Sequence, residues 1–194
     1  MSLPTLVLGS TSRYRAELLR RLYADFEQRA PGTDETPLPG ETPRQRALRL
    51  AVAKARAAAE GLDDALVIGS DQVAELDGIV LDKPGSADRA RAQLAASSGR
   101  EVHFHTALCL HDTRNGQDLV HVDHTRVRFR SLDDAEIARY VEREQPLDCA
   151  GSFKCEGLGI SLFERIDNED PSALIGLPLI ALARLLREAG LTLP

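Results

Sequence analysis

The sequence predicts an α/β protein whose mixed, twisted β-sheet is flanked by helices. Apolar, strand-like runs alternate with helical patterns that begin at Ser, Thr or Asp caps along most of the chain. Two dipeptides typical of tight hairpins, Asp77-Gly78 and Asn115-Gly116, each join two strand-like segments. Hairpins combined with helical connections predict a sheet that contains both parallel and antiparallel strands.

Length, composition and charge narrow the class of protein. The 194 residues, of which 43% are hydrophobic, suit one domain or one domain with two closely joined lobes. No apolar run approaches the roughly 20 residues that span a bilayer, and the chain enters a strand by Thr5 without a basic leader. We therefore expect a cytoplasmic protein. A net charge of −6 disfavours nucleic-acid and membrane partners, so a small anionic substrate would need a local basic cluster.

The first element in order is a strand over residues 6–10, followed by a Ser-rich turn and a helix from Arg13 to Leu22 with Ser12 as its N-cap. This turn places Ser10 and free backbone N–H groups at the positive end of a helix, with Arg15 beside it. Such a site stabilises an anion. Helix termini with Ser and Arg also occur in many proteins that bind no phosphate, so both interpretations remain.

A short strand at residues 26–30 is followed by a loop rich in Pro and Gly, residues 31–40, which contains Glu35. Glu35 belongs either to a solvated acidic turn or to a metal site, because Mg²⁺ prefers oxygen ligands. A helix then runs from the cap Thr42 to Gly61 with an apolar stripe through Ala47, Leu48, Ala51, Val52 and Ala55. Lys54 lies off that stripe, where a lysine is usually a surface charge.

Residues 65–73 form the central strand, and its C-terminal end delivers Asp71. The hairpin at Asp77-Gly78 returns the chain to Lys83-Pro84, which would bring Lys83 back towards Asp71. A carboxylate and an ammonium at adjacent strand ends form either a structural ion pair or a site that handles anions. The residues alone do not decide between the two.

The remaining elements are predicted from caps and alternation. Helices are expected over residues 87–97, 131–144 and 179–188, and strands over 101–111, 118–129 and 160–166. The Gly-rich stretch 149–160 contains Lys154 and Glu156 and is typical of a loop that faces a ligand. It lacks the third glycine of a dinucleotide fingerprint, and the chain has neither a GxxxxGK[ST] phosphate loop nor a GxSxG esterase motif.

Cysteines and histidines give little support for a metal centre. Three cysteines without a CxxC pair favour reduced thiols over a disulfide framework or a cysteine zinc site. His103 and His105 share a strand face, with His121 and His124 on the following strand, which raises the alternative of a metal site. Catalytic zinc usually needs three ligands that converge on one point, and the spacing of these histidines indicates no third ligand beside a pair.

Five separate segments together resemble, in order, the signature of Maf-type nucleoside triphosphate pyrophosphatases, and the resemblance covers essentially the whole chain. Tyr14, Gln72 and Glu156 stand where the branch acting on 7-methyl-GTP carries its aromatic, Gln and Glu specificity residues. That branch usually has Trp at position 14 and Pro at position 13, and the dTTP/UTP branch has Arg at position 14. The five segments are Leu8–Arg15, Asp34–Thr36, Ile68–Gln72, Lys83-Pro84 and Ala150–Phe153.

The resemblance implies a Maf / inosine-triphosphatase-like α/β fold in which residues 1–194 form a single domain of two lobes with a central cleft. It also implies hydrolysis between the α and β phosphates of a nucleoside triphosphate with Mg²⁺, Mn²⁺ or Co²⁺, and a homodimer. The resemblance further implies that Asp71 is the proton acceptor that activates water. It makes Glu35 a candidate carboxylate of the metal site or the phosphate site. The residues implied to hold the triphosphate are Ser10, Arg15, Lys54 and Lys83.

The preference for 7-methyl-GTP has a physical basis. Methylation at N7 gives guanine a positive charge, so an aromatic face and a carboxylate both attract it. Tyr14 would supply the face, Glu156 the carboxylate and Gln72 an amide contact. The alternatives are a dTTP/UTP pyrophosphatase of the same family, an enzyme for deaminated purines such as ITP, and a nucleotide-sensing regulator of cell division. For Glu156 the alternative is a surface ion pair with Lys154 or Arg165.

Overall fold

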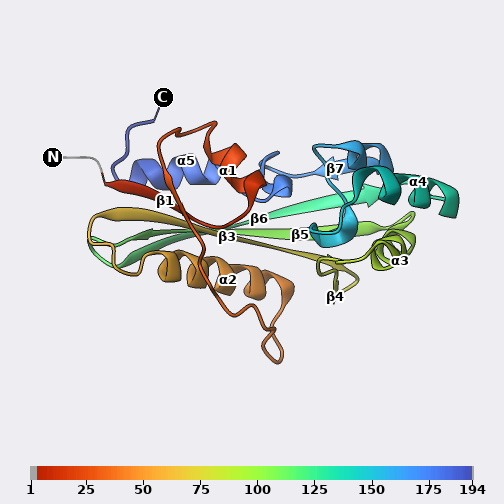
Figure 1. The fold of residues 1–194 in the computed structure, drawn as a ribbon, viewed down its shortest axis with the longest axis horizontal. Coiled ribbons are helices and arrows are strands. Elements are labelled where there is room, and N and C mark those ends of the chain that lie inside the picture. The colour runs from red at the N-terminus through yellow and green to blue at the C-terminus, as the bar shows by residue number, and fades with distance from the viewer. Residues whose placement is uncertain (1–3, 194) are drawn as a thin grey trace. The chain divides into compact units, whose positions relative to one another are not determined.

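The computed structural model describes residues 4–193, and its central feature is a mixed sheet of seven strands (Figure 1). The order is β2-β1-β3-β5-β6-β7, and β4 pairs with β3. β1 is parallel to both β2 and β3, whereas the pairs β3–β4 and β6–β7 are antiparallel, which confirms the predicted mixed sheet. The strands are β1 Thr5–Gly9, β2 Glu27–Arg29, β3 Ala65–Leu76, β4 Ile79–Val80, β5 Glu101–Asp112, β6 Gln117–Phe129 and β7 Phe163–Asp167.

Five α-helices and three short 3₁₀ helices are found among the described residues. The predicted caps are confirmed at Ser12, Thr42 and Ser86, whose side chains accept the backbone N–H three residues on. Several boundaries differ from expectation. The first helix ends at Leu19 and the second at Ala58, the central strand extends to Leu76, the helix predicted from residue 131 begins at Asp134, and the 3₁₀ turn before β7 delays that strand to Phe163. The helices are α1 Arg13–Leu19, α2 Pro43–Ala58, α3 Ala87–Ser97, α4 Asp134–Glu144, α5 Leu179–Glu188, η1 Ala150–Ser152, η2 Leu158–Leu162 and η3 Ala173–Ile175. No helix in the described part of the chain is both long and apolar enough to cross a membrane.

The chain divides into two compact units. Unit 1 contains the described residues up to Asp71, Thr106–Asp123, and those from Asp170 onward. Unit 2 contains Gln72–His105 and His124–Glu169. The long strands β3, β5 and β6 contribute residues to both units. On β3 the boundary between the units falls between Asp71 and Gln72.

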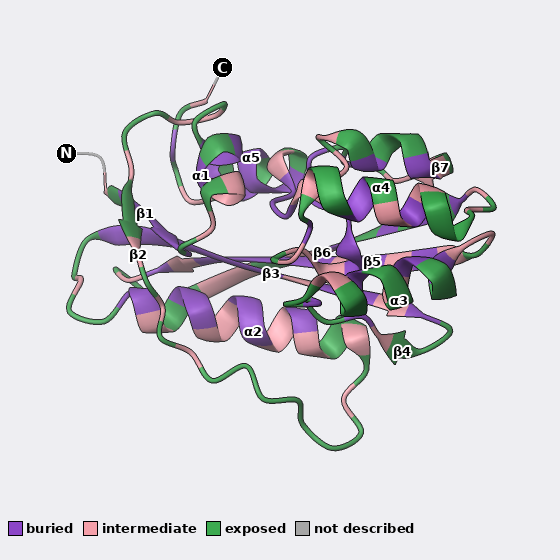
Figure 2. Cartoon of the chain, turned by 45° about the vertical axis from the view of Figure 1, so that its right-hand side comes forward, coloured by how far each residue is buried: buried purple, intermediate pink, exposed green. Residues whose placement is uncertain are grey.

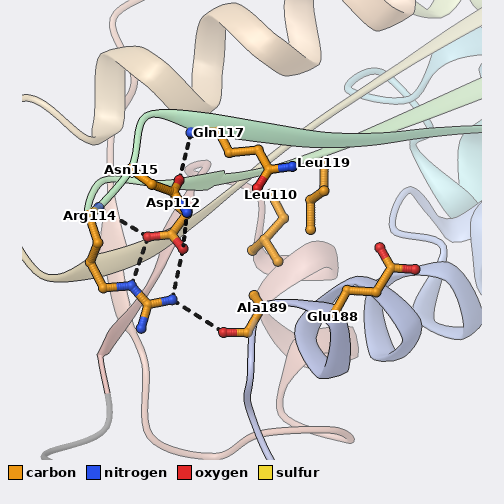
Figure 3. A pocket seen from close by; sticks show the side chains of 8 residues that line it. All are labelled: Leu110, Asp112, Arg114, Asn115, Gln117, Leu119, Glu188 and Ala189. Atoms are coloured by element: carbon orange, nitrogen blue, oxygen red, sulfur yellow. Dashed lines mark hydrogen bonds and ion pairs between the residues drawn. The ribbon is translucent and has the colours of Figure 1, made fainter.

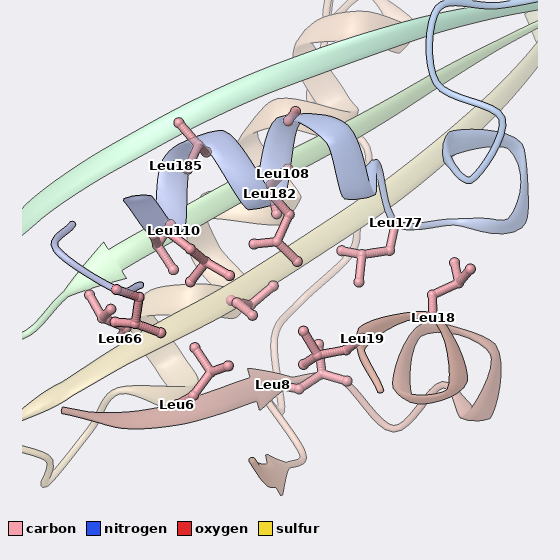
Figure 4. Close-up of a cluster of buried hydrophobic side chains, with 14 of the residues drawn as sticks. Leu6, Leu8, Leu18, Leu19, Leu66, Leu108, Leu110, Leu177, Leu182 and Leu185 are labelled. Atoms are coloured by element: carbon pink, nitrogen blue, oxygen red, sulfur yellow. The ribbon is translucent and has the colours of Figure 1, made fainter. Parts of the chain in front are cut away.

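In unit 1 both faces of the sheet are buried, which explains the continuous apolar runs of β1 and β3. Leu6 and Leu8 of β1 point to one face, where a leucine-rich core forms with α1 and α5 (Figure 4). Val7 and Val67 belong to the other face, where they cluster with Ala58 at the end of α2. Figure 1 shows α2 running along this part of the sheet. Because side chains alternate along a strand, two buried faces require apolar residues at every position.

Two glycines allow α2 to lie unusually close to the sheet. A Cβ atom on Gly69 would lie 2.1 Å from the carbonyl oxygen of Ala51 and 2.5 Å from the nitrogen of Ala55. A Cβ on Gly9 would lie 2.8 Å from the Cβ of Ala58. No larger residue fits at either position without moving the helix, so these glycines set the distance between α2 and the carboxyl ends of β1 and β3.

Unit 2 has its own hydrophobic centre and the predicted central hairpin (Figure 2). Asp77 and Gly78 both adopt positive φ, 50° and 81°, as a type I′ turn requires. Helices α3 and α4 each bury one side, shown in purple, and expose the other. The aromatic rings in this unit pack edge to face, with centroids 4.7–5.7 Å apart; they belong to Phe104, Phe129, Phe153 and Phe163.

Candidate active site

The candidate site in unit 1 is built around Asp71, the last residue of this unit on β3. The Nζ atom of Lys54 lies 2.6 Å from Asp71 Oδ1 and 2.6 Å from Glu35 Oε1. Lys54 and Asp71 are both buried, whereas Glu35 is exposed. Three residues that the sequence named separately therefore form one charged cluster, in which an ammonium bridges two carboxylates.

The buried side of α2 differs from the side that the sequence predicts, and Lys54 belongs to it. The predicted stripe ran through Leu48 and Val52, but the buried side of α2 runs through Ala47, Leu50, Ala51, Lys54, Ala55 and Ala58. This side consists mostly of alanine because Gly9 and Gly69 bring the sheet so close. Lys54 is thus four residues after Leu50 on the buried side, not a surface charge, and Asp71 and Glu35 compensate its burial.

The loop that carries Glu35 is held by local hydrogen bonds and by α2. Asp34 Oδ1 accepts hydrogen bonds from the backbone nitrogen of Thr36 at 2.9 Å and from its hydroxyl at 2.6 Å, and these bonds lower the pKa of Asp34. Arg49 of α2 binds Glu41 through two nitrogens and donates to the carbonyl of Thr36 at 3.2 Å. Asp34 therefore shapes the turn, and Glu35 beside it is the residue that reaches Lys54.

Arg15 and Ser10 adjoin the same cluster. Arg15 Nη1 donates to the Ser10 hydroxyl at 3.4 Å, and Arg15 Nε donates to the carbonyl of Gly176 at 2.9 Å. Burial lowers the pKa of the Arg15 guanidinium, and the charges of Asp71 and Glu35 oppose that shift. The structure therefore brings Ser10, Arg15, Glu35, Lys54 and Asp71 together within unit 1.

Sequence reasoning missed two residues that support this cluster. The buried Ser70 hydroxyl lies 2.8 Å from the carbonyl of Ala107 and 2.9 Å from that of Gly176. From sequence alone, Gly176-Leu177-Pro178 is typical only of an interruption before the last helix. For Ser70 the sequence offers one signal, its position directly before Asp71. For Gly176 it offers none, because no local pattern predicts that this residue lies beside Ser70.

Tyr14 lies at the start of α1 in unit 1, half-buried. The Arg13 guanidinium carbon lies 4.8 Å above the centre of its ring, and Arg13 Nη2 donates to the Tyr14 hydroxyl at 2.8 Å. A cation already rests on one face of this ring. The residue at position 13, where the resembling branch has Pro, is therefore in direct contact with the predicted base platform.

The other predicted site residues belong to unit 2. Gln72 follows Asp71 directly and is half-buried, while Lys83 and Glu156 are exposed. The partner of Asp71 is Lys54, and the approach of Lys83 to Asp71 stays a prediction. The proposed surface pairs for Glu156 are wrong, because Lys154 Nζ donates to the carbonyl of Glu144 at 2.9 Å and Arg165 binds Asp167.

Comparison with known proteins identifies the family. The model of the Maf family, described as Maf-like protein, matches residues 5–189. The chain belongs to the Maf family.

Its curated Maf relatives are similar over nearly their full lengths. A protein named 7-methyl-GTP pyrophosphatase from Burkholderia thailandensis is 60% identical over 192 residues, covering 97% of this chain and 89% of the relative. A protein of the same name from Xanthomonas oryzae pv. oryzae is 57% identical and covers 99% and 100% of the two chains. Among solved structures, the Ham1 protein of Staphylococcus aureus has a TM-score of 0.53 at 18% identity, covering 95% of this chain and 99% of that one. That likeness supports the fold alone.

Three of the five histidines of this Maf protein stack on one another. Within unit 2 the His124 ring stacks on His103 and His105, with centroids 5.2 and 5.0 Å away. Across the described residues, no group of three or more His, Cys, Asp and Glu side chains is arranged to hold a metal ion. The three cysteines are free thiols, as the sequence predicts.

A cavity of about 380 Å³ in unit 1 is separate from the candidate site (Figure 3). Asp112 and Arg114 form a bidentate ion pair in its wall, and Arg114 also donates to the carbonyl of Ala189 at 3.2 Å. Thr113 is hydrogen-bonded to Ala65 at the start of β3, six residues and thus about 20 Å from Asp71. Glu188, also in the wall, binds Arg184 at 2.7 Å. The charged groups of the wall thus have partners within the protein, and the cavity does not supply the chemistry of the Asp71 cluster.

Proposed function

We propose that this Maf protein hydrolyses 7-methyl-GTP to 7-methyl-GMP and pyrophosphate, and so removes a modified nucleotide from the pool. The observation that carries the reaction is the cluster in unit 1, where Lys54 bridges the carboxylates of Asp71 and Glu35 and the charges of both carboxylates act on Arg15. The names of relatives at 57–60% identity over nearly their full lengths support the substrate.

The residues of the cluster suit complementary roles. Arg15, with its planar fork of donors, and Lys54 bind oxygens of the triphosphate, and the Ser10 hydroxyl adds a neutral contact. Lys83 is a further proposed ligand of the triphosphate. Asp71 accepts a proton from the water that attacks the phosphorus, and Lys54 at 2.6 Å fixes the orientation of its carboxylate.

The donor set also suits a divalent cation. Mg²⁺ is usually bound by one or two carboxylates together with substrate phosphates and several waters, and Glu35 and Asp71 supply two carboxylates that converge on one point. These two residues would hold the ion. When bound, a divalent cation neutralises charge on the phosphate oxygens. Lys54, which bridges both carboxylates in this structure, would then turn towards the phosphates.

Three residues are proposed to select the base. Tyr14 provides an aromatic face, Glu156 an exposed carboxylate and Gln72 an amide directly after Asp71. A positively charged 7-methylguanine ring is attracted to the first two, whereas neutral guanine gains less from either. Arg13 on the Tyr14 ring moves aside or stacks on the opposite face when the base binds.

The test is pyrophosphate release from 7-methyl-GTP, GTP, dTTP, UTP, CTP and ITP, each with Mg²⁺, Mn²⁺ or Co²⁺. We expect 7-methyl-GTP to have the highest kcat/KM, and we expect Asp71→Asn to lower kcat by about 10²–10⁴-fold because the proton acceptor is lost. Asp34→Asn is the matched control, since Asn can make the same turn with Thr36 and should retain activity.

Each other outcome identifies an alternative. If dTTP or UTP has the highest kcat/KM, the proposed reaction is supported, but the proposed roles of Tyr14, Gln72 and Glu156 in base recognition are wrong. A lead by ITP indicates an enzyme for deaminated purines. If the protein binds nucleotide but releases no pyrophosphate from any of the six, it is a nucleotide-sensing regulator.

A further inference from the structure

The carbonyl of Gly176 links Arg15 to the strand that carries Asp71. It accepts a hydrogen bond from Arg15 Nε at 2.9 Å, and the Ser70 hydroxyl donates to it from the same distance. A carbonyl oxygen has two lone pairs, so it can accept both. Two hydrogen bonds to one carbonyl thus connect a proposed phosphate ligand, Arg15, to Ser70, the residue directly before the proposed general base Asp71.

The turn that presents this carbonyl is itself anchored. The buried Asp170 accepts from the nitrogen and the hydroxyl of Ser172 at 2.9 and 2.5 Å, and its second oxygen accepts from the nitrogen of Ile180 at 2.7 Å. Thr106 on β5 donates to the carbonyl of Ala173 at 3.0 Å. These contacts tie both ends of the turn to α5 and the sheet, so the Gly176 carbonyl is held before any ligand arrives.

Gly176 and Arg15 also fit each other closely. Gly176 has φ of 124°, a backbone conformation that strains any L side chain, and an added Cβ would lie 3.5 Å from Arg15 Nε. The bond from Nε fixes the plane of the guanidinium, and Nη1 then reaches the Ser10 hydroxyl. Because a guanidinium donates only within its plane, fixing the plane fixes the direction in which its remaining N–H groups can bind phosphate.

We propose that Ser70 and the carbonyl of Gly176 are positioning groups for Arg15, which they hold in the orientation that binds the triphosphate. The expected effect of these groups on KM rests on the proposed function. Their effect on the orientation of Arg15 does not. Neither group touches the substrate. The single proton of the Ser70 hydroxyl is shared between the carbonyls of Ala107 at 2.8 Å and Gly176 at 2.9 Å, so Ser70 ties the carbonyl that receives Arg15 to β5.

The first measurement is the exchange of the Arg15 Nε–H proton with water, followed by NMR in the wild type, Ser70→Ala and Ser97→Ala. Ser97 is the matched control, because it is an equally buried serine whose hydroxyl donates to a carbonyl, that of Gln93 in helix α3 of unit 2. We expect Ser70→Ala alone to accelerate the exchange. Unchanged exchange would overturn the proposal.

The second measurement separates positioning from stability. We expect Ser70→Ala to raise KM for the preferred nucleotide about fivefold, the loss of roughly one neutral hydrogen bond, with kcat within about twofold. In an Arg15→Lys background, which lacks Nε–H, the same change should raise KM no further. A lower melting temperature without a change in KM, or equal effects in both backgrounds, would assign Ser70 a purely structural role.

The proposed hydrolysis and the positioning role of Ser70 can be disproved separately. If the wild type releases pyrophosphate from no nucleotide, the proposed function fails. The Nε–H exchange rates still decide whether Ser70 and Gly176 hold Arg15, with faster exchange in Ser70→Ala supporting the proposal and equal rates overturning it.

Discussion

At the scale of single residues, the loop that carries Glu156 is held by contacts of its neighbours with Glu144. Glu144, near the end of α4, accepts from the nitrogen of Leu158 at 2.7 Å, and Lys154 donates to the Glu144 carbonyl. A Cβ atom on Gly157 would lie 2.7 Å from a carboxylate oxygen of Glu144, so a larger residue there would require the Glu144 side chain to move. Lys154 is thus used to fix the loop, and the Glu156 carboxylate stays exposed.

We predict that Glu156→Gln lowers the preference for 7-methyl-GTP over GTP by about 1–3 kcal/mol, because a charge-assisted hydrogen bond to the cationic base is lost. The measurement is the ratio of kcat/KM for the two nucleotides. Glu142→Gln, at another exposed glutamate of unit 2, should leave the ratio unchanged. An unchanged ratio in Glu156→Gln would remove this residue from base recognition.

At the scale of elements, the contact between α2 and β3 determines where Lys54 lies. The backbone of α2 passes so close to Gly69 that the added Cβ would approach two of its backbone atoms within 2.5 Å. A flexible side chain could move aside, but a helix backbone cannot do so locally. The helix would have to shift as a whole, and Lys54 with it.

We therefore expect Gly69→Ala to lower the free energy of unfolding by about 1–3 kcal/mol and to reduce pyrophosphate release as well. Urea denaturation followed by circular dichroism measures the first effect. Gly116→Asn serves as the control, because this hairpin glycine has open space around its missing side chain and Asn tolerates its positive φ. Equal stability of Gly69→Ala and the wild type would show that the helix adapts.

At the scale of the whole molecule, the sequence predicts the elements better than their contacts. Hairpins, caps and strands follow from local rules, so the Asp77-Gly78 turn and the cap at Thr42 were predictable. The burial of Lys54 depends on Gly69, fifteen residues later, and the return of Gly176 to Ser70 spans 106 positions. Local patterns carry no information on such contacts. The family resemblance alone placed Lys54 near the substrate, and nothing in the sequence placed Gly176 there.

The balance of charge in the candidate site leads to a prediction on binding kinetics. The two cations Arg15 and Lys54 face the two anions Glu35 and Asp71, so their formal charges sum to zero, and the chain carries −6. Such a site does not attract an anion over long distances. We expect the association rate of a fluorescent nucleotide, measured by stopped flow between about 20 and 200 mM NaCl, to fall by less than about twofold. A steep fall with salt would reveal a positive field.

The three free cysteines have a consequence for the chemical durability of the protein. Burial raises the pKa of the Cys109, Cys149 and Cys155 thiols to about 12, and in each case a neighbouring carboxylate adds to the shift. At neutral pH only about one thiol in 10⁵ is then ionised. Because the thiolate is the form that peroxides and alkylating reagents attack, oxidative stress should leave the cysteines of this protein reduced.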